Sequence, residues 1–337
     1  MAMAAVLLAA VASAAPTRLA VTGASGYLGA EIVWQAVAQG HSVTAIVRDA
    51  AAAARVLPRG TRLLPMADLT EAAAAARAAE GVDAVIHTAS VFRRCADMEA
   101  ELVLPNLRMA EAMARACAAS GARLVLTSSM AAVRGATQPP RDGVAYTVDD
   151  WNRVSRRSGG GMEAYQYSKM ASERRAREMA AELGVELVCL CPSMILGPPR
   201  DAASSCFSVE MVRRWLDGTA PVSSLLVCDV RDCAAAHINA AVAPRLQAQR
   251  YIVSCEARLA ASDAAEAIRN RVGHAAVPDM TADDAAGAGI IPVGQQEVVA
   301  LAGLQELGVE CRPNELTYAD MAESLLQSQP KEVLRAP

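Results

Sequence analysis

Lysine is almost absent from this sequence. Its 337 residues contain 32 lysines and arginines together, yet only two of these are lysines, Lys169 and Lys331. A position that keeps lysine against such a bias is expected to need a compact ammonium on a flexible stem, which the planar guanidinium of arginine does not supply. Lys331 lies in a polar C-terminal tail. The bias therefore directs attention to Lys169.

Aromatic residues and an excess of positive charge are also lacking. Aromatics make up 3% of the chain, so an aliphatic core is expected. The net charge of −4 and the pI near 5.7 give no electrostatic reason to expect binding to nucleic acid. Alanine inflates the mean hydropathy of +0.21, and no stretch reads as a transmembrane helix. We therefore predict neither a nucleic-acid nor a membrane partner.

The nine cysteines form no CxxC pair and no Cys/His cluster, so no metal site is predicted. We expect reduced, mostly buried thiols in a reducing compartment, which favours a cytoplasmic location. Residues 1–15 are apolar and end in small residues, as a signal peptide does, but no basic residue precedes the apolar run. We interpret them as an N-terminal extension, with targeting as the alternative.

Tyr165 stands four residues before Lys169, and the run from Met170 to Leu183 has the alanine, glutamate and arginine content of a helix. Residues four apart on a helix share a face, so the phenol and the ammonium should be neighbours. The ammonium should lower the pKa of Tyr165, which could then give a proton to a carbonyl or take one from an alcohol. A surface tyrosine with a chance lysine neighbour would leave the same pattern, so other motifs must decide.

A short apolar strand, Arg18–Thr22, runs into a glycine-rich turn and then into a helix predicted over 30–39. In this context the glycines allow a tight turn and close approach of the backbone to a ligand, and the helix N-terminus faces a pyrophosphate. The turn therefore predicts a dinucleotide site formed by Gly23, Ser25, Gly26, Tyr27, Leu28 and Gly29.

Arg48 follows the second predicted strand, Ser42–Val47, where NAD-binding proteins often carry an acidic residue for the ribose hydroxyl. A guanidinium at that position suits the 2′-phosphate of NADP(H) instead. Asp49 stands beside it. The alternative that Arg48 is only a solvated side chain therefore stays open.

Short apolar strands alternate with helices, which predicts βαβ units and a parallel sheet. The predicted fold class is α/β, a Rossmann-type doubly wound sheet with a smaller C-terminal α/β substrate lobe. We expect the dinucleotide-binding domain to span 16–192, the lobe to span mainly 193–330 with some segments returning to the sheet, and 331–337 to form a tail. Ligands bind at the carboxyl ends of such strands, and Ser129 follows the strand predicted over 123–127.

Together these motifs resemble the extended short-chain dehydrogenase/reductase family, and within it the branch of dihydroflavonol, cinnamoyl-CoA and aldehyde reductases. The resemblance runs from Arg18 to Leu326. It rests on the segments Thr22–Gly29, Asp68-Leu69, His87–Ser90, Leu126–Ser129, Tyr165-xxx-Lys169 and Pro192–Ile195, with Val47–Asp49 and Val230–Asp232 as marks of the branch.

The resemblance implies a role for each position. Tyr165 would be the catalytic acid or base, Lys169 would lower its pKa and hold the nicotinamide ribose, and Ser129 would hydrogen-bond the carbonyl oxygen. Further cofactor contacts would come from Asp68, Leu69, Thr88, Ala89, Ser90, Pro192, Met194 and Ile195. A hydrophobic substrate pocket could be lined by Val91, Phe92, Met130 and Phe207, although such residues are as often part of a core.

One position departs from the family pattern. Where many relatives carry asparagine in the helix before the serine strand, this chain has Arg108, and Asn106 lies two residues away. The proton-relay role of that asparagine is therefore not carried over with the other roles.

The resulting hypothesis is an NADPH-dependent oxidoreductase that reduces an aldehyde, ketone or CoA thioester by hydride transfer at a Ser/Tyr/Lys site. A nucleotide-sugar epimerase or dehydratase, or a hydroxysteroid-type dehydrogenase, would share these motifs. A non-enzymatic dinucleotide sensor is a further alternative, although such proteins typically lose the Tyr-xxx-Lys pair. The expected partner is a small carbonyl or alcohol substrate, and the expected assembly is a monomer or homodimer.

Overall fold

The computed structural model describes residues 16–273 except 94 and 137, residue 301, and residues 303–328. The N-terminal extension 1–15 and the tail 331–337 lie outside the described residues. Within the described part, no helix is both long enough and apolar enough to cross a membrane. All nine cysteines are free thiols and six of them are buried, as the sequence predicted.

A seven-stranded sheet runs through the molecule in the order β3-β2-β1-β4-β5-β6-β9, with every neighbouring pair parallel. The chain starts in the middle of the sheet, moves out to one edge and then crosses back to the other, which is the doubly wound order. The strands are β1 (Arg18–Thr22), β2 (Ser42–Val47), β3 (Arg62–Pro65), β4 (Ala84–His87), β5 (Arg123–Thr127), β6 (Leu187–Pro192) and β9 (Arg250–Val253). The predicted Rossmann-type α/β fold is confirmed.

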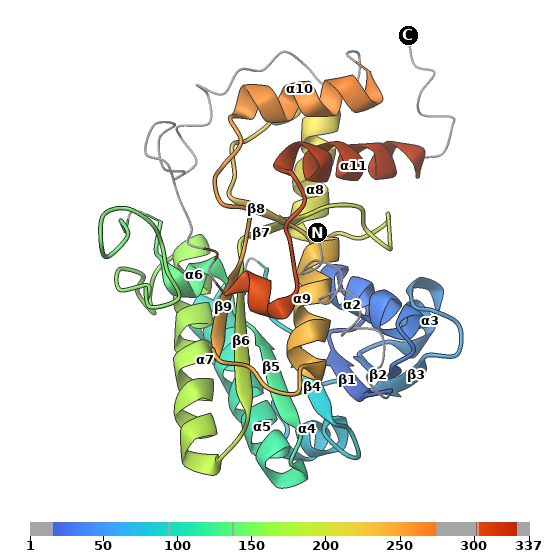
Figure 1. Ribbon diagram of the computed structural model, residues 1–337, viewed down its shortest axis with the longest axis vertical. Coiled ribbons are helices and arrows are strands. Elements are labelled where there is room, and N and C mark those ends of the chain that lie inside the picture. The colour runs from blue at the N-terminus through green and yellow to red at the C-terminus, as the bar shows by residue number, and fades with distance from the viewer. Residues whose placement is uncertain (1–15, 94, 137, 274–300, 302, 329–337) are drawn as a thin grey trace, which may run out of the picture.

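Helices cover both faces of the sheet (Figure 1). Successive side chains of a strand point to opposite faces, so Leu19 and Val21 of β1 pack under one helical layer and Ala20 packs under the other. The first layer consists of α2 (Tyr27–Ala38), α3 (Ala50–Val56) and α9 (Val230–Val242), and the second of α4 (Ala72–Ala78), α5 (Leu104–Ser120) and α7 (Met162–Leu183). A π-helical segment, Glu99–Val103, leads into α5, and a short helix, α6 (Met130–Val133), follows β5.

A smaller lobe begins where β6 ends. There β7 (Met194–Leu196) continues the chain beyond the sheet and pairs with β8 (Val227–Asp229). Because β7 follows the last residues of β6, the lobe lies over the carboxyl ends of the strands (Figure 1). Its own core includes the stacked rings of Trp215 and Tyr318. Its helices are α8 (Phe207–Leu216), α10 (Ala261–Val272) and α11 (Asn314–Gln327), while a 3₁₀ turn, Leu304–Leu307, packs on the sheet layer.

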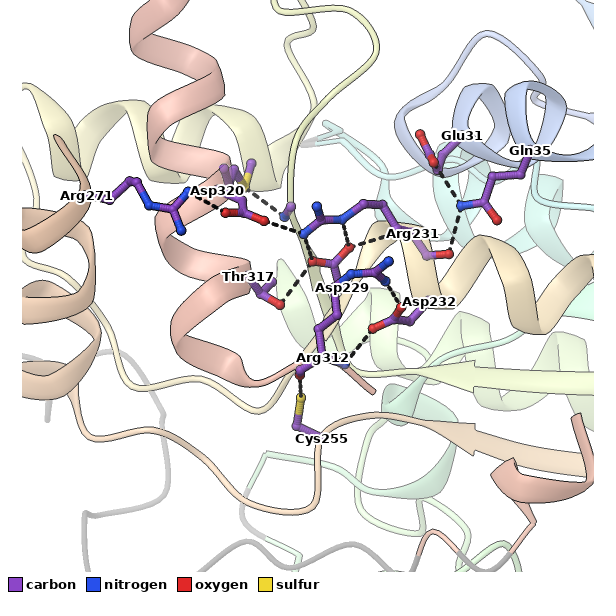
Figure 2. Close-up of polar contacts among 12 residues, drawn as sticks. Glu31, Gln35, Asp229, Arg231, Asp232, Cys255, Arg271, Arg312, Thr317 and Asp320 are labelled. Carbon is purple, nitrogen blue, oxygen red and sulfur yellow. Dashed lines mark hydrogen bonds and ion pairs between the residues drawn. The ribbon is translucent and has the colours of Figure 1, made fainter. Parts of the chain in front are cut away.

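A buried carboxylate joins this lobe to the sheet layer (Figure 2). Asp229 at the end of β8 is fully buried and caps α9 by accepting a hydrogen bond from the backbone N–H of Arg231 at 2.8 Å. The Arg231 guanidinium pairs with Asp229 at 2.7 Å and with Asp320 of α11 at 2.8 Å. Thr317, also on α11, donates its hydroxyl to Asp229 at 3.1 Å. Asp229 and Arg231 therefore connect α11 to α9.

We expect Asp229→Asn to lower the free energy of unfolding by roughly 2–4 kcal/mol, because it leaves the Arg231 guanidinium without its best-placed anion. Urea-induced unfolding followed by circular dichroism measures the change. Glu266→Gln, the same chemical change on the exposed side of α10, should alter the free energy by less than about 0.5 kcal/mol. A loss at Asp229 no larger than that of the control would show that the buried carboxylate does not hold the lobe.

Candidate active site

The glycine-rich turn between β1 and α2 leaves no room for a side chain at its glycine positions. Gly23 has a φ of +65°, and a Cβ on it would lie 3.0 Å from the backbone of Ala89. A Cβ on Gly29 would lie 2.2 Å from the carbonyl oxygen of Gly23. Gly26 begins α2 with no side-chain cap, and no acidic residue stands in the first turn. The free N–H groups of that turn therefore suit a pyrophosphate.

The other residues predicted in this turn have different surroundings. Ser25 is exposed, whereas Leu28 is buried in the core. Tyr27 turns towards the smaller lobe, where its hydroxyl donates to the carbonyl of Gly197 at 2.6 Å. Burial raises the pKa of Tyr27 well above its usual value. Tyr27 and Leu28 could therefore meet a cofactor only through their backbone.

Arg48 is exposed at the carboxyl end of β2, on the side where an adenosine ribose would lie if the turn binds a dinucleotide. The carboxylate of Asp49 accepts from the backbone N–H of Ala52 at 3.0 Å and so caps α3. One carboxylate oxygen of Asp49 is thereby used by the helix. Asp68 is also exposed and accepts from the N–H of Thr70 at 2.8 Å, which holds the pKa of its carboxyl below the usual value. The side chain of Leu69 is buried.

Tyr165 and Lys169 lie one turn apart near the start of α7, and both face the carboxyl end of β5. The Nζ of Lys169 is 5.9 Å from the centroid of the Tyr165 ring, so the predicted neighbours are confirmed. The ammonium donates to the carbonyl oxygen of Thr127 at 3.1 Å. The Thr127 hydroxyl in turn lies 2.9 Å from Nε2 of His237, whose Nδ1–H donates to the Cys233 carbonyl.

The expected net fall in the pKa of Tyr165 is not found, because burial outweighs the influences that lower it. Burial raises the pKa of Tyr165 to about 12, and a hydrogen bond with Ser129 opposes this rise only in part. Burial also lowers the pKa of Lys169 to about 8, against the opposing influence of Cys191 and Glu173. At neutral pH the phenol is therefore protonated and the lysine is mostly charged.

Two serines follow β5, and only one of them faces the phenol. Ser129 is hydrogen-bonded to Tyr165 and also accepts from the N–H of Ala131 at 3.1 Å. Ser128 is buried and donates its hydroxyl to Glu173 at 2.6 Å. The structure therefore places Ser129, rather than Ser128, beside Tyr165.

The residues that follow β4 are held in place by the strand ends and by α5. The Thr88 hydroxyl donates to the Thr22 carbonyl at 2.7 Å, and Ala89 donates its N–H to the Thr22 hydroxyl at 3.3 Å. His87 lies 2.7 Å from the same hydroxyl, and burial lowers its pKa to about 3, so it is a neutral structural residue.

Asn106 is a site residue that the sequence argument set aside. It is buried on α5, where its Oδ1 accepts from the N–H of Val91 at 2.7 Å and from the hydroxyl of Ser90. Its Nδ2 donates to the Val91 carbonyl at 3.0 Å and to the hydroxyl of Ser168 on α7. Arg108 is exposed. A polar residue on the buried face of an amphipathic helix was the signal that could have identified Asn106.

The two phenylalanines of the chain lie against each other, and one of them, Phe92, also packs on Tyr165. The Phe92 ring is 4.5 Å from the Tyr165 ring, and the Phe207 ring meets Phe92 edge-on at 5.6 Å. Phe92 follows β4 whereas Phe207 begins α8 in the smaller lobe, and they are 42% and 44% exposed. Large aromatic side chains left this exposed beside a partly buried phenol form an apolar surface that a ligand could cover.

The remaining predicted residues divide between core and site. Met130 is buried in a core cluster, and Val91 is partly buried against two clusters, so we assign both to packing rather than to substrate contact. Pro192 ends β6, while Met194 and Ile195 belong to β7, which keeps all three at the carboxyl edge of the sheet. Among the described residues, no group of His, Cys, Asp and Glu is placed to hold a metal ion.

The chain matches the family model described as "NAD dependent epimerase/dehydratase family" over residues 19–255. It is similar to cinnamoyl-CoA reductase 1 of Arabidopsis thaliana, with 35% identity over 264 residues that cover 74% of this chain and 73% of that protein. Cinnamoyl-CoA reductase CAD2 of Medicago truncatula is 28% identical over 321 residues, which cover 92% of this chain and 95% of that protein.

Among solved structures, yeast methylglyoxal/isovaleraldehyde reductase Gre2 in complex with NADPH is similar in fold. The superposition has a TM-score of 0.76 at 22% identity and covers 92% of this chain and 98% of that chain. This likeness extends over the sheet and over the lobe above it, so the fold of the whole described molecule has a solved counterpart.

We predict that the ammonium of Lys169 titrates near pH 8, far below the value of about 10.4 for an exposed lysine. Because the chain has only two lysines, protein labelled with [ε-¹³C]lysine should give two side-chain signals in NMR spectra. Lys169→Arg removes one signal and so assigns it. A midpoint at pH 10 or above for that signal would show that burial does not disfavour the charge of Lys169.

Proposed function

The chain belongs to the NAD dependent epimerase/dehydratase family of extended short-chain dehydrogenases/reductases, and from this premise we propose that it is an NADPH-dependent carbonyl reductase. The observation that carries the proposal is the convergence of Ser129, Tyr165 and Lys169 at the carboxyl end of β5. These groups can donate a hydrogen bond and a proton to one oxygen atom, which is what reduction of a carbonyl requires.

Tyr165 would act as the acid in this reaction. With a pKa of about 12 the phenol carries its proton at neutral pH and can give it to a substrate oxygen. The phenolate left behind would be stabilised by the hydroxyl of Ser129 and by the charge of Lys169, 5.9 Å from the ring centroid. NADPH, when bound, supplies the hydride for the carbonyl carbon.

The cofactor assignment rests on two features of the first layer. The turn from Gly23 to Gly29 has no space for a side chain at its glycines, and the first turn of α2 has no acidic residue to repel a pyrophosphate. Arg48 would then bind the ribose of the adenosine half of the cofactor. We assign NADPH rather than NADH because a guanidinium can form charge-assisted hydrogen bonds to a 2′-phosphate, while Asp49 is committed to capping α3.

The two phenylalanines suggest which kind of substrate fits. They come from the main domain and the smaller lobe and meet each other, and Phe92 also packs on Tyr165, so the group attached to a carbonyl at the phenol would lie against Phe92 and could extend to Phe207. We propose that this group is apolar, in an aldehyde, a ketone or a CoA thioester. Two similar proteins are named as cinnamoyl-CoA reductases, and such a substrate has an apolar acyl group.

A screen of aldehydes, ketones and CoA thioesters with apolar substituents, followed by the absorbance of NADPH, tests the proposed function. We expect at least one class to be reduced and polar carbonyl compounds of equal size to react more slowly. Tightly retained NAD in the purified protein, together with no reductase activity, would instead favour a nucleotide-sugar epimerase or dehydratase.

Tyr165→Phe should lower kcat by roughly 10²–10⁴-fold, the usual contribution of a general acid, because the ring is kept and the proton is lost. NADPH binding, measured by fluorescence titration, should change by less than about twofold. Tyr167→Phe is the matched control, since Tyr167 lies on the same helix and packs in the Leu102–Val103 cluster. Near wild-type turnover in Tyr165→Phe would require another acid.

Arg48→Ala should raise the KM for NADPH by roughly 10–100-fold, the scale of hydrogen bonds to a charged group, and should leave the KM for NADH nearly unchanged. Steady-state kinetics with both cofactors measures the difference. Arg55→Ala is the control, because Arg55 is an exposed arginine of α3 that bonds to its own helix at the Ala51 carbonyl. Equal effects on both cofactors, or a wild-type preference for NADH, would contradict the role of Arg48.

A further inference from the structure

Three successive turns of α7 contact three successive residues at the end of β5. Tyr165 bonds with Ser129, Lys169 with the carbonyl of Thr127, and Glu173 with the hydroxyl of Ser128. The three helical residues are four apart and therefore share one face. The proposed reaction uses the first two, and the third has no role in it.

Glu173 is an ionisable residue without any exposed surface. Its Oε2 accepts from the Ser128 hydroxyl at 2.6 Å, and the Cys191 thiol lies 3.6 Å from the same oxygen. Its Oε1 accepts from the Nε of Arg250 at 2.6 Å. A buried carboxylate is costly to desolvate, so its cation and its hydrogen bonds are needed to keep it charged.

Arg250, the first residue of β9, supplies that cation and is itself 5% exposed. Its Nη1 donates to the carbonyls of Val148 and Asp150, both at 2.6 Å, and its guanidinium lies 3.9 Å from the centroid of the Trp151 ring. The ion pair of Glu173 and Arg250 therefore connects α7 to the last strand of the sheet and to the loop that precedes α7.

The contact of Glu173 with Ser128 decides which hydroxyl at the strand end is available. Of the three hydroxyls on Thr127, Ser128 and Ser129, the first lies against His237 and the second is bonded to Glu173. Only that of Ser129 is directed to Tyr165. Releasing Ser128 would free the strand end one residue before Ser129.

Glu173 also supplies negative charge beside Lys169. The titratable groups that influence Lys169 are Glu173 on its own helix, Cys191 on β6 and, through mutual repulsion, His87 on β4, while Tyr165 lies one turn before it. Burial raises the pKa of the Cys191 thiol to about 12, and the pKa of His87 is about 3, so both are neutral near pH 8. The phenol of Tyr165 is neutral there as well. Glu173 is therefore the anion that favours the charged form of this lysine.

We propose that Glu173 is a positioning residue of the reductase site, which fixes the end of β5 through Ser128 and holds Lys169 in its charged form. The inference rests on the proposed function for its effect on turnover. Its effect on Lys169 can be measured without any substrate.

Glu173→Gln tests the proposal, because it keeps the shape of the side chain and its acceptor for Ser128 while removing the charge. The midpoint of the Lys169 signal in [ε-¹³C]lysine-labelled protein should fall below that of the wild type by on the order of half a pH unit. The alkaline limb of the kcat–pH profile should move down by the same amount. Glu182→Gln, the same change at an exposed position of α7, should move neither.

Ser128→Ala tests the other half of the proposal. Without its partner at Glu173, the strand end is expected to shift relative to Tyr165, and kcat should fall by roughly 10-fold to 100-fold, the scale of a small misplacement of reacting groups. The Lys169 midpoint should stay at the wild-type value. An unchanged kcat in Ser128→Ala would overturn the positioning of the strand end.

The unpaired Arg250 could unfold the single variant, so Glu173→Gln/Arg250→Met is the second variant, in which no buried cation is left alone. Its Lys169 midpoint should also fall. A purely structural role would lower the melting temperature and leave the midpoint and the kcat per folded molecule unchanged, which would overturn the proposal. If the wild type reduces no carbonyl compound, the proposed function fails. The titration midpoint of Lys169 still shows whether Glu173 keeps this lysine charged.

Discussion

The docking of α7 against the carboxyl end of β5 is the contact on which the rest of this structure depends. It buries an ammonium and a carboxylate on one face of one helix, Lys169 at 8% exposure and Glu173 at 0%. Desolvating each ion costs several kcal/mol, so hydrogen bonds from the surrounding groups must offset this free energy. The Thr127 carbonyl, the Ser128 hydroxyl and the Arg250 guanidinium do so. The site chemistry and the core are therefore built by the same contacts.

The smaller lobe is fixed to this centre from two sides. Asp229 and its partners hold α11 against α9 (Figure 2), and the hydroxyl of Tyr27 in the glycine-rich turn donates to the carbonyl of Gly197 in the lobe. Phe207 at the start of α8 is carried by that lobe to the ring of Phe92. The apolar surface beside Tyr165 therefore depends on how the lobe is attached, although no residue of the attachment touches the phenol.

Much of the sheet could be predicted because buried parallel strands are short, continuous apolar runs. β1, β2 and β5 have the bounds that the sequence indicated. The elements that were missed have weak local signals. β7 is three residues long and follows a proline, while α3 is a run of alanines whose only start signal is the capping Asp49. Such segments depend on tertiary partners more than on their own pattern.

For the site, the sequence alone determined which residue types stand at the strand ends and one turn apart on α7, because periodicity and glycine spacing are local properties. It predicted a site made of Ser129, Tyr165, Lys169 and the glycine turn. Tertiary structure decided what depends on burial and on contacts between distant segments. It raised rather than lowered the pKa of Tyr165, and it buried Met130. It also paired Glu173 with Arg250, 77 residues away in the chain. No spacing in the sequence encodes that pair, because desolvation and long-range pairing exist only once the helix lies on the sheet.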